Sequence, residues 1–316
     1  MSRIKKIALV FAAAVMLFAV GCSEIEDEVI EVTETTVTEP EPQPYPAFAG
    51  QLEFDEAPKT AASLSPAITE IICGLGYGDK LVGISDYCDR PEEITGRQTL
   101  GSAANPNIDE IIGLRPELLI SQSPIAKKDV VRLEGNGIRV LILSAPNSVS
   151  ELRDCYRDIA AVFGGELTAD AAADDAMKDF YAEMKAAEGT VDSFLFILTP
   201  DLNAASTDTF MGDMLSCLGR NTAASANPTV EEILADPPEL LILASPMGVS
   251  DLPEELQSLD CITEGRILNL KPNMLERPAA RVGKFIPDIA KAAADRISGE
   301  TASETEDTSE EETNDE

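Results

Sequence analysis

The chain has 316 residues, with 24 basic and 57 acidic side chains, no histidine, no tryptophan and a formal net charge of −33. An acidic chain without clusters of Lys and Arg argues against nucleic-acid binding, because phosphates call for basic side chains. The absence of histidine removes the usual base of Ser and Cys hydrolases and the imidazole ligands of zinc sites, so we predict no catalytic residue and no metal site.

The first 22 residues have the pattern of a lipoprotein signal peptide. Three basic residues precede an unbroken apolar run, residues 7–20, and Gly21 and Cys22 follow it. This run is too short for a permanent membrane span, which needs roughly 20 apolar residues. We predict that residues 1–21 are removed and that Cys22 carries a lipid. The protein is then extracytoplasmic, anchored to the outer face of the cell membrane or periplasmic; an ordinary secretory signal with a chance cysteine is the alternative.

Acidic stretches with few apolar residues lie at both ends of the mature chain. Residues 23–41 hold eight acidic and no basic side chains, and residues 299–316 hold nine acidic and no basic ones. Such segments cannot form a core, so we predict a disordered tether over residues 22–57 and a disordered tail over residues 299–316. The roughly 250 residues between them are enough for two modest lobes.

Strands and helices alternate along the first half of the remaining chain. We predict, in order, strand 61–64, helix 66–75, strand 81–85, a helix and strand within residues 105–124, helix 127–134 and strand 139–143. Residues 149–163 and 169–187 then have helical periodicity and no strand pattern. The second half predicts strand 194–198, helix 210–218, a helix and strand within residues 227–246, helix 253–259, strand 267–270 and a final helix 279–296.

An internal repeat relates the two halves. NPNIDEIIGLRPELLISQSP at residues 105–124 aligns without a gap with NPTVEEILADPPELLILASP at residues 227–246, and eleven of the twenty positions are identical. Each copy predicts a cap at Asn107 or Thr229, a short amphipathic helix, a proline break and a buried strand. A repeat of this length indicates two similar lobes rather than a solenoid.

This order predicts an α/β fold with two Rossmann-like lobes, parallel sheets and a long helical connector. The predicted boundaries are residues 58–147 for the N-terminal lobe, 148–190 for the connector and 191–298 for the C-terminal lobe. Open α/β sheets bind ligands beyond the carboxyl ends of their strands. We therefore expect a ligand cleft between the lobes.

Three segments together resemble a known family. They are SLSPAITEIICGLGYGDKLVGISDYCDRP at residues 63–91, NPNIDEIIGLRPELLIS at residues 105–121 and KPNMLERPAARV at residues 271–282. In this order they resemble the substrate-binding proteins of iron-complex, haem and cobalamin ABC importers, and SDYCDRP and LERP are most similar to the cobalamin-binding members. The resemblance covers nearly all of residues 61–296. It implies a binding protein rather than an enzyme, a monomer without a cofactor, that delivers a small molecule to a membrane permease and its ATPase.

The resemblance also implies ligand-binding residues. In cobalamin-binding proteins the tyrosine after the second strand contacts the ligand and matches Tyr87, and the segment before the last helix matches Asn273, Glu276 and Arg277. An aromatic face with amide and guanidinium donors suits a corrinoid, which is a broad apolar ring edged with amides. The structural alternative is that Tyr87 packs at a strand end and that Glu276 and Arg277 open the last helix.

The chain departs from the best-known cobalamin binders at their pocket tryptophans, because Ala103, Gln122 and Ser225 occupy about those places. We predict a corrinoid ligand, with a haem or a ferric siderophore as alternatives. Gln122 is included among the ligand-binding positions, as is Ser65. Ser65 either only caps the following helix or also marks a helix start whose backbone N–H groups meet a polar ligand edge.

Acidic residues at equivalent positions of the repeat are candidates for docking to the permease. In the resembled family an acid on each lobe pairs with permease arginines, and Asp109 and Glu231 match those positions. Glu110 and Glu232 lie where a capping-box acid folds back onto the cap, most clearly for Glu232 with Thr229, which leaves Asp109 and Glu231 freer to point outward. The alternative is that all four acids simply favour helix starts.

Two other classes of function stay open at this point. A glycosidase that uses two carboxylates needs no histidine, but sugar sites usually have aromatic platforms and the chain has no tryptophan. A structural surface lipoprotein would have no small-molecule cleft between its lobes.

Overall fold

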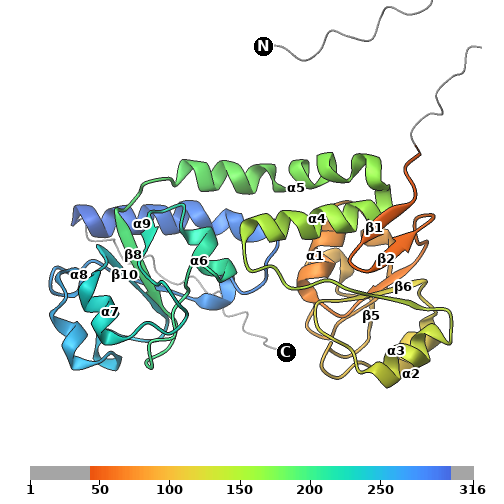
Figure 1. Ribbon diagram of the computed structural model, residues 1–316, viewed down its shortest axis with the longest axis horizontal. Helices are drawn as coiled ribbons and strands as arrows, with labels where there is room; N and C mark the ends of the chain where they lie inside the picture. Colours follow the sequence, from red (N-terminus) through yellow and green to blue (C-terminus); the bar gives the residue numbers. More distant parts are fainter. Residues whose placement is uncertain (1–42, 300–316) are drawn as a thin grey trace, which may run out of the picture. The chain divides into compact units, whose positions relative to one another are not determined.

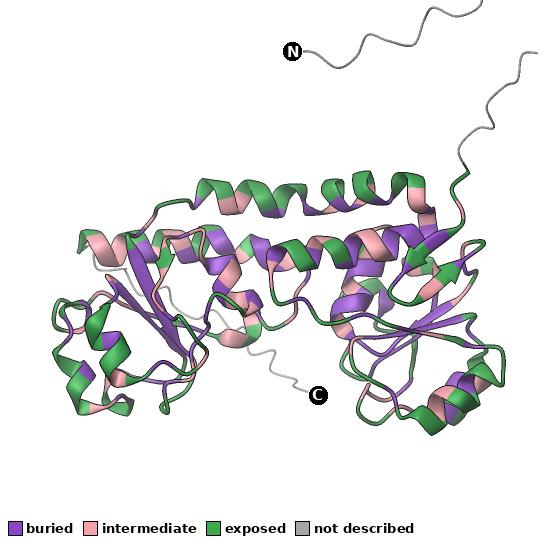
Figure 2. Cartoon of the chain, in the orientation of Figure 1, coloured by how far each residue is buried: buried purple, intermediate pink, exposed green. Residues whose placement is uncertain are grey.

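The computed structural model describes residues 43–299. The predicted signal peptide at residues 1–21, the predicted lipid site at Cys22, most of the predicted tether and all but the first residue of the predicted tail lie outside the described residues. Figure 1 shows the described part as two α/β lobes with the helices α4 and α5 beside them. Figure 2 shows buried residues concentrated in the strands and alternating with exposed residues along the helices.

A five-stranded parallel sheet in the order β5-β4-β3-β6-β7 forms the N-terminal lobe. Its strands are β3 (Ala61–Ser63), β4 (Leu81–Ile84), β5 (Gln98–Thr99), β6 (Leu118–Ser121) and β7 (Arg139–Ile142). Its helices are α1 (Pro66–Gly74), α2 (Ile108–Leu114) and α3 (Lys127–Glu134), with the 3₁₀ helices η1 (Gly78–Lys80) and η2 (Glu92–Ile94). Every residue of β3 and β6 is buried, as expected for the centre of a parallel sheet with both faces covered.

A four-stranded parallel sheet in the order β11-β10-β8-β9 forms the C-terminal lobe. Its strands are β8 (Ser193–Ile197), β9 (Arg220–Asn221), β10 (Leu240–Ala244) and β11 (Ile267–Leu270). Its α-helices are α6 (Phe210–Leu215), α7 (Val230–Ala235), α8 (Asp260–Thr263) and α9 (Ile286–Ser298). The longer predicted strands of both lobes are confirmed. The two-residue strands β5 and β9 were not predicted, because two residues are too few to show a periodic pattern.

The repeat corresponds to α2-β6 in one lobe and α7-β10 in the other. Both helices begin at the predicted caps: Asn107 Oδ1 accepts from the Glu110 N–H at 3.4 Å, and Thr229 Oγ1 accepts from the Glu232 N–H at 3.2 Å. Only the second copy completes a capping box, in which the Thr229 N–H donates to Glu232 Oε2 at 2.8 Å. Both repeat strands are central in their sheets, β6 next to β3 and β10 next to β8.

Two consecutive helices, α4 (Val149–Gly164) and α5 (Glu166–Ala186), connect the two sheets along the chain. They match the two helical stretches predicted for the connector and pack against each other (Figure 1). The chain reverses between them at Gly165, which has φ +90°. A side chain here would place its Cβ 2.6 Å from Pro44 Cβ, so the reversal requires glycine both for its backbone conformation and for space.

The predicted disordered tether extends too far. Residues that we assigned to it form an antiparallel hairpin of β1 (Ala47–Ala49) and β2 (Leu52–Phe54). Phe54 is buried, and the guanidinium of Arg139 lies 4.1 Å from the centre of its ring. The hairpin packs on α4, so tertiary contacts order a segment whose own composition is too polar and too short to predict a strand.

The last part of the C-terminal lobe differs from the prediction in helix type. The predicted helix at residues 253–259 is the 3₁₀ helix η4 (Glu254–Ser258), preceded by η3 (Val249–Asp251). The predicted helix at residues 279–296 begins as the 3₁₀ helix η6 (Ala280–Phe285) and becomes α-helical only at Ile286. Pro287 lies in the first turn of α9, where its missing N–H costs nothing and its ring favours a new helix start.

Candidate ligand-binding site

Two predicted site residues meet at the carboxyl ends of neighbouring strands. Ser65 follows β3 and caps α1, where its hydroxyl oxygen accepts from the Ile68 N–H at 3.3 Å. The same hydroxyl donates to Gln122 Oε1, just after β6, at 2.5 Å. Ser65 therefore caps the helix and also orients the side-chain amide of Gln122.

That amide has an unused donor. Gln122 Nε2 is buried and has no hydrogen-bond partner among the described residues. A buried N–H group without an acceptor is costly, and native structures rarely leave one unexplained. An acceptor atom of a ligand at this strand end would satisfy it.

Two further serines, which the sequence did not single out, form hydrogen bonds that stabilise the turns at these strand ends. Ser63 Oγ donates to the Ser65 carbonyl at 2.9 Å and accepts from the Ser65 N–H at 3.3 Å. Ser121 makes the same pair of bonds with Ser123, at 2.8 and 3.1 Å. The pattern Ser-x-Ser-Pro occurs at residues 63–66 and 121–124, and this repetition is the signal that identifies the turns in the sequence.

Tyr87 follows β4 and is exposed. Its side chain is 66% accessible, although its backbone N–H donates to Ser85 Oγ at 3.4 Å. Together with Asp86 it borders an open hollow of the N-terminal lobe. A residue this exposed packs little against the strand end, so Tyr87 stays a predicted ligand contact.

The predicted residues of the C-terminal lobe lie after β11. Asn273 belongs to the 3₁₀ helix η5 (Pro272–Met274) and, like Glu276, is exposed. The guanidinium of Arg277 forms an ion pair with Asp89, in the loop after β4. The alternative that Glu276 and Arg277 open the last helix is wrong, because the helical segment begins only at Ala280. Arg277 instead joins the strand-end loops of the two lobes.

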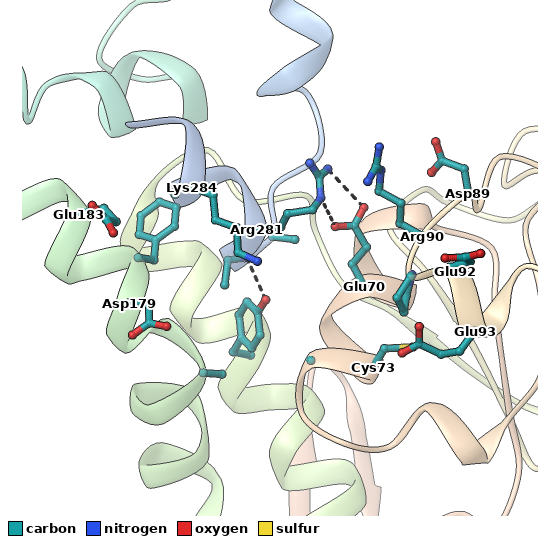
Figure 3. Close-up of a pocket in the computed structure, with 18 residues that line it drawn as sticks. Glu70, Cys73, Asp89, Arg90, Glu92, Glu93, Asp179, Glu183, Arg281 and Lys284 are labelled. Carbon is teal, nitrogen blue, oxygen red and sulfur yellow. Dashed lines mark hydrogen bonds and ion pairs between the residues drawn. The ribbon is translucent and has the colours of Figure 1, made fainter. Parts of the chain in front are cut away.

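A second ion pair joins the lobes beside the first. Arg281 Nε donates to Glu70 Oε2 at 2.8 Å, and its Nη2 donates to Oε1 at 3.5 Å, as Figure 3 shows. Nearby, the Ala280 N–H donates to the hydroxyl of Tyr156, on α4, at 2.9 Å. Burial raises the pKa of Tyr156 to about 12, so this phenol stays neutral over the physiological range. These contacts fix the start of η6 against the N-terminal lobe and the connector.

A cavity of about 910 Å³ lies beside this second ion pair (Figure 3). Its walls come from α1, residues 89–93, α4, α5 and η6, and charged side chains of both signs line it. Asp89 and Arg281 belong to its walls, whereas none of the six residues predicted to bind ligand does. The cavity therefore adjoins the interlobe ion pairs without being formed by the predicted ligand-binding side chains.

The two candidate docking acids differ in their surroundings. Asp109 is 80% exposed and forms an ion pair with Arg132 of α3, so it points outward but is not free of partners. Glu231 is exposed and has no ion-pair partner among the described residues. Glu110, expected to fold back onto Asn107, instead accepts from Gln98 Nε2 at 3.3 Å. The capping box is therefore present only at Thr229 and Glu232, where the sequence indicates it most clearly.

The described residues offer little else with reactive chemistry. The five cysteines within residues 43–299 are free thiols, and burial raises the pKa of Cys73 to about 11 and that of Cys155 to about 12, so both are protonated. That part of the chain holds no group of acidic or thiol side chains arranged to bind a metal ion. No helix in it has both the length and the apolar content of a membrane span.

Comparison with known proteins identifies the family of this chain. Residues 62–263 match the model of a family described as periplasmic binding protein. An uncharacterised ABC transporter substrate-binding lipoprotein of Bacillus subtilis is 26% identical over 251 residues, covering 74% of this chain and 80% of the relative. A cobalamin-binding protein of Halobacterium salinarum is 23% identical over 268 residues, covering 76% and 71%.

Solved structures share the fold. One is a protein of Staphylococcus epidermidis that is described as a possible iron-binding periplasmic solute-binding protein. It superposes with a TM-score of 0.65 at 23% identity, covering 75% of this chain and 99% of the other. The vitamin B12-binding protein of Vibrio cholerae gives 0.57 at 18% identity, covering 76% and 98%. A haem-binding protein of Roseiflexus also gives 0.57, at 22% identity, covering 76% and 100%.

Proposed function

Because the chain belongs to the periplasmic binding protein family, as a substrate-binding protein of the ABC importers for iron complexes, haem and vitamin B12, we propose that it captures a corrinoid between its two lobes. The observation that carries this proposal is the meeting of strand-end loops from both lobes at Asp89 and Arg277. Ligands of open α/β sheets bind at such strand ends.

The proposed site combines groups from both lobes. Tyr87 offers an exposed aromatic face, and Gln122 offers a buried N–H donor that has no acceptor within residues 43–299. From the other lobe, Arg277 offers a guanidinium, and the exposed Asn273 and Glu276 offer polar atoms. Ser65 acts through Gln122, whose amide it orients. An apolar ring edged with amides and acceptors matches this combination.

A binding panel tests the ligand. Calorimetric titration of the purified protein with cobalamin, cobinamide, haem and a ferric siderophore should give saturable heat with the corrinoids. Because the chain has no histidine, the protein cannot supply an imidazole to cobalt. Bound cobalamin should therefore have the same visible spectrum as free cobalamin in solution. Saturable binding of haem or siderophore, with no heat in the corrinoid titrations, would support the importer function but contradict a corrinoid as its ligand. Turnover of a glycan would support the glycosidase instead.

We also propose that the acids Asp109 and Glu231 dock the loaded protein, as a monomer, to the permease that works with its ATPase. Their equivalent places in the repeat and their exposure support this role. Charge reversal at both residues should abolish uptake of the ligand by cells and leave its affinity unchanged, and unchanged uptake would contradict the proposal. Reversal of Glu134, on the exposed face of α3, is a suitable control.

Cys22 is proposed as the lipid anchor. Replacing Cys22 with Ser should release the protein from the membrane fraction, because the signal pattern before it would no longer end in an acceptor for lipid. Mass spectrometry of the native N-terminal peptide should find acyl groups. A variant that stays fully membrane-bound, together with a native peptide that carries no lipid, would contradict the anchor.

A further inference from the structure

Two ion pairs cross between the lobes, and both use arginines of the segment after β11. Arg277 pairs with Asp89 in the loop after β4, and Arg281, four residues later, pairs with Glu70 in α1. Both pairs therefore join the segment after β11 to the N-terminal lobe, one at the loop after β4 and the other at α1. Their surroundings differ.

The pair of Arg281 and Glu70 is enclosed. The Glu70 side chain is 7% exposed and accepts two hydrogen bonds from one guanidinium. Breaking such a pair would leave a buried charge without compensation, so exchange with a ligand is unfavourable. We therefore expect this pair to stay intact when a ligand binds.

The pair of Arg277 and Asp89 is open to solvent. Its side chains are 31% and 61% exposed. Burial tends to raise the pKa of Asp89, but the hydrogen bond and the charge of Arg277 outweigh it and lower the pKa, so Asp89 is a carboxylate at neutral pH. A half-exposed ion pair contributes little to stability because water competes for both partners. Another anion can therefore replace Asp89 at small cost.

This open pair includes one residue of the proposed ligand site, Arg277. Asp89 lies two residues after the exposed Tyr87, and Arg277 is one of the residues proposed to contact the ligand. In the absence of ligand the guanidinium already has an anionic partner. Arg277 increases the affinity only for a ligand that carries an oxyanion, because a planar guanidinium prefers a carboxylate or phosphate to a neutral amide.

We propose that Asp89 is a specificity-determining residue, an internal counter-ion of Arg277 that is displaced by the oxyanion of a phosphate- or carboxylate-bearing ligand. The inference rests on the proposed function and narrows it to ligands with such a group. Ligands of the same shape without an oxyanion leave the ion pair intact and obtain no contribution from Arg277. The protein then distinguishes ligands by whether their oxyanion can replace the Asp89 carboxylate at Arg277.

The test compares matched ligands on the full mature chain in detergent. Cobalamin carries a phosphodiester in its nucleotide loop, and cobinamide has the same ring without that loop. By calorimetry, Asp89→Asn should tighten cobalamin binding about threefold to fivefold, because the competing charge is gone, and should leave cobinamide unchanged. Arg277→Gln should weaken cobalamin binding more than cobinamide binding, because only cobalamin brings a phosphodiester to the guanidinium. If haem is the ligand bound, haem and its dimethyl ester replace the two corrinoids.

A matched control separates this effect from the loss of any surface ion pair. Arg220 and Asp236 form a comparably exposed pair in the C-terminal lobe, with side chains 57% and 51% accessible. Asp236→Asn should change neither affinity. Equal changes of both affinities in Asp89→Asn, or no change in either, would overturn the proposal.

A measurement without ligand separates failure of this inference from failure of the proposed function. The pKa of the Asp89 carboxyl, followed by NMR titration without ligand, should lie below its ordinary value in the wild type and rise in Arg277→Gln, because the guanidinium that lowers it is gone. An Asp89 pKa that does not change in Arg277→Gln overturns the counter-ion whatever the ligand. A lowered pKa of Asp89 in a wild-type protein that binds none of the probes rejects the proposed function, and the exchange with it.

Discussion

The two copies of the repeat have the same core and different ends. Ile120 in β6 and Ile242 in β10 occupy equivalent positions and are both completely buried. One residue later, Ser121 in the first copy corresponds to Leu243 in the second, and Gln122 corresponds to the buried Ala244. One strand therefore ends in hydrogen-bonding groups and the other in apolar side chains.

This difference distinguishes the residues that form the core of a lobe from the residues that can form a binding site. A central parallel strand needs apolar residues on both faces, so both copies retain Leu-Leu-Ile. Past the strand end this requirement no longer applies. Within the part of the chain that the structure describes, the N-terminal copy places there the side chain of Gln122, whose Nε2 has no acceptor, and the C-terminal copy places Ala244. On the proposed function, Gln122 of the N-terminal lobe would supply the amide recognition, and the C-terminal lobe would contribute mainly through the segment after β11.

The largest expected effect tests the equivalence of the cores. Ile120→Ala and Ile242→Ala should each lower the free energy of unfolding by about 2–5 kcal/mol, because both remove a fully buried side chain and leave a cavity. Urea unfolding followed by circular dichroism measures the loss. Val131→Ala, at a position 60% exposed on α3, is the control and should change little. A loss below about 1 kcal/mol at only one isoleucine would show that the copies are not equivalent.

The next effect tests the aromatic group of the N-terminal lobe. Tyr87→Ala should weaken corrinoid binding by about 1–3 kcal/mol, or roughly fivefold to a hundredfold, because it removes an apolar contact with the ligand. Stability should stay nearly unchanged, since the ring is 66% exposed. Tyr181→Ala, on α5, serves as a control for loss of an exposed ring. Unaltered affinity in Tyr87→Ala would remove this residue from the site.

A smaller effect tests the contrast between Gln122 and Ala244 directly. Gln122→Met keeps the approximate size of the side chain and removes its amide, so binding should weaken by about 1 kcal/mol, or roughly fivefold, through one lost hydrogen bond. Calorimetry gives the affinity. Gln98→Met, on the exposed β5, is the matched control. Equal affinities for wild type and Gln122→Met would mean that the unused donor does not meet the ligand.

The smallest effect concerns the helix starts. Glu232→Ala should lower the free energy of unfolding by about 0.5–1 kcal/mol, because it breaks the hydrogen bond from the Thr229 N–H. Glu110→Ala should cost less, since its carboxylate does not return to the cap at Asn107. Thermal unfolding of the two variants side by side measures the difference. Equal losses would contradict a capping box confined to the second copy.

Much of the fold could be predicted because its signals are local. The cap at Ser65 followed by Pro66 marks the start of α1, and the apolar strands between helical stretches indicate parallel sheets. The β1–β2 hairpin could not be predicted this way. Its side chains become ordered through contact with α4 and Arg139, which lie far along the chain.

The sequence by itself determined the elements and the individual groups that a site can use, among them Tyr87 and Gln122. Helix caps, strand periodicity and proline breaks depend on residues only a few positions apart, so they can be found without a structure. Only the tertiary structure decided which groups meet. Ser65 and Gln122 are 57 positions apart, and Asp89 and Arg277 are 188 apart. Such pairs depend on how sheets and lobes pack, and no local pattern specifies that geometry.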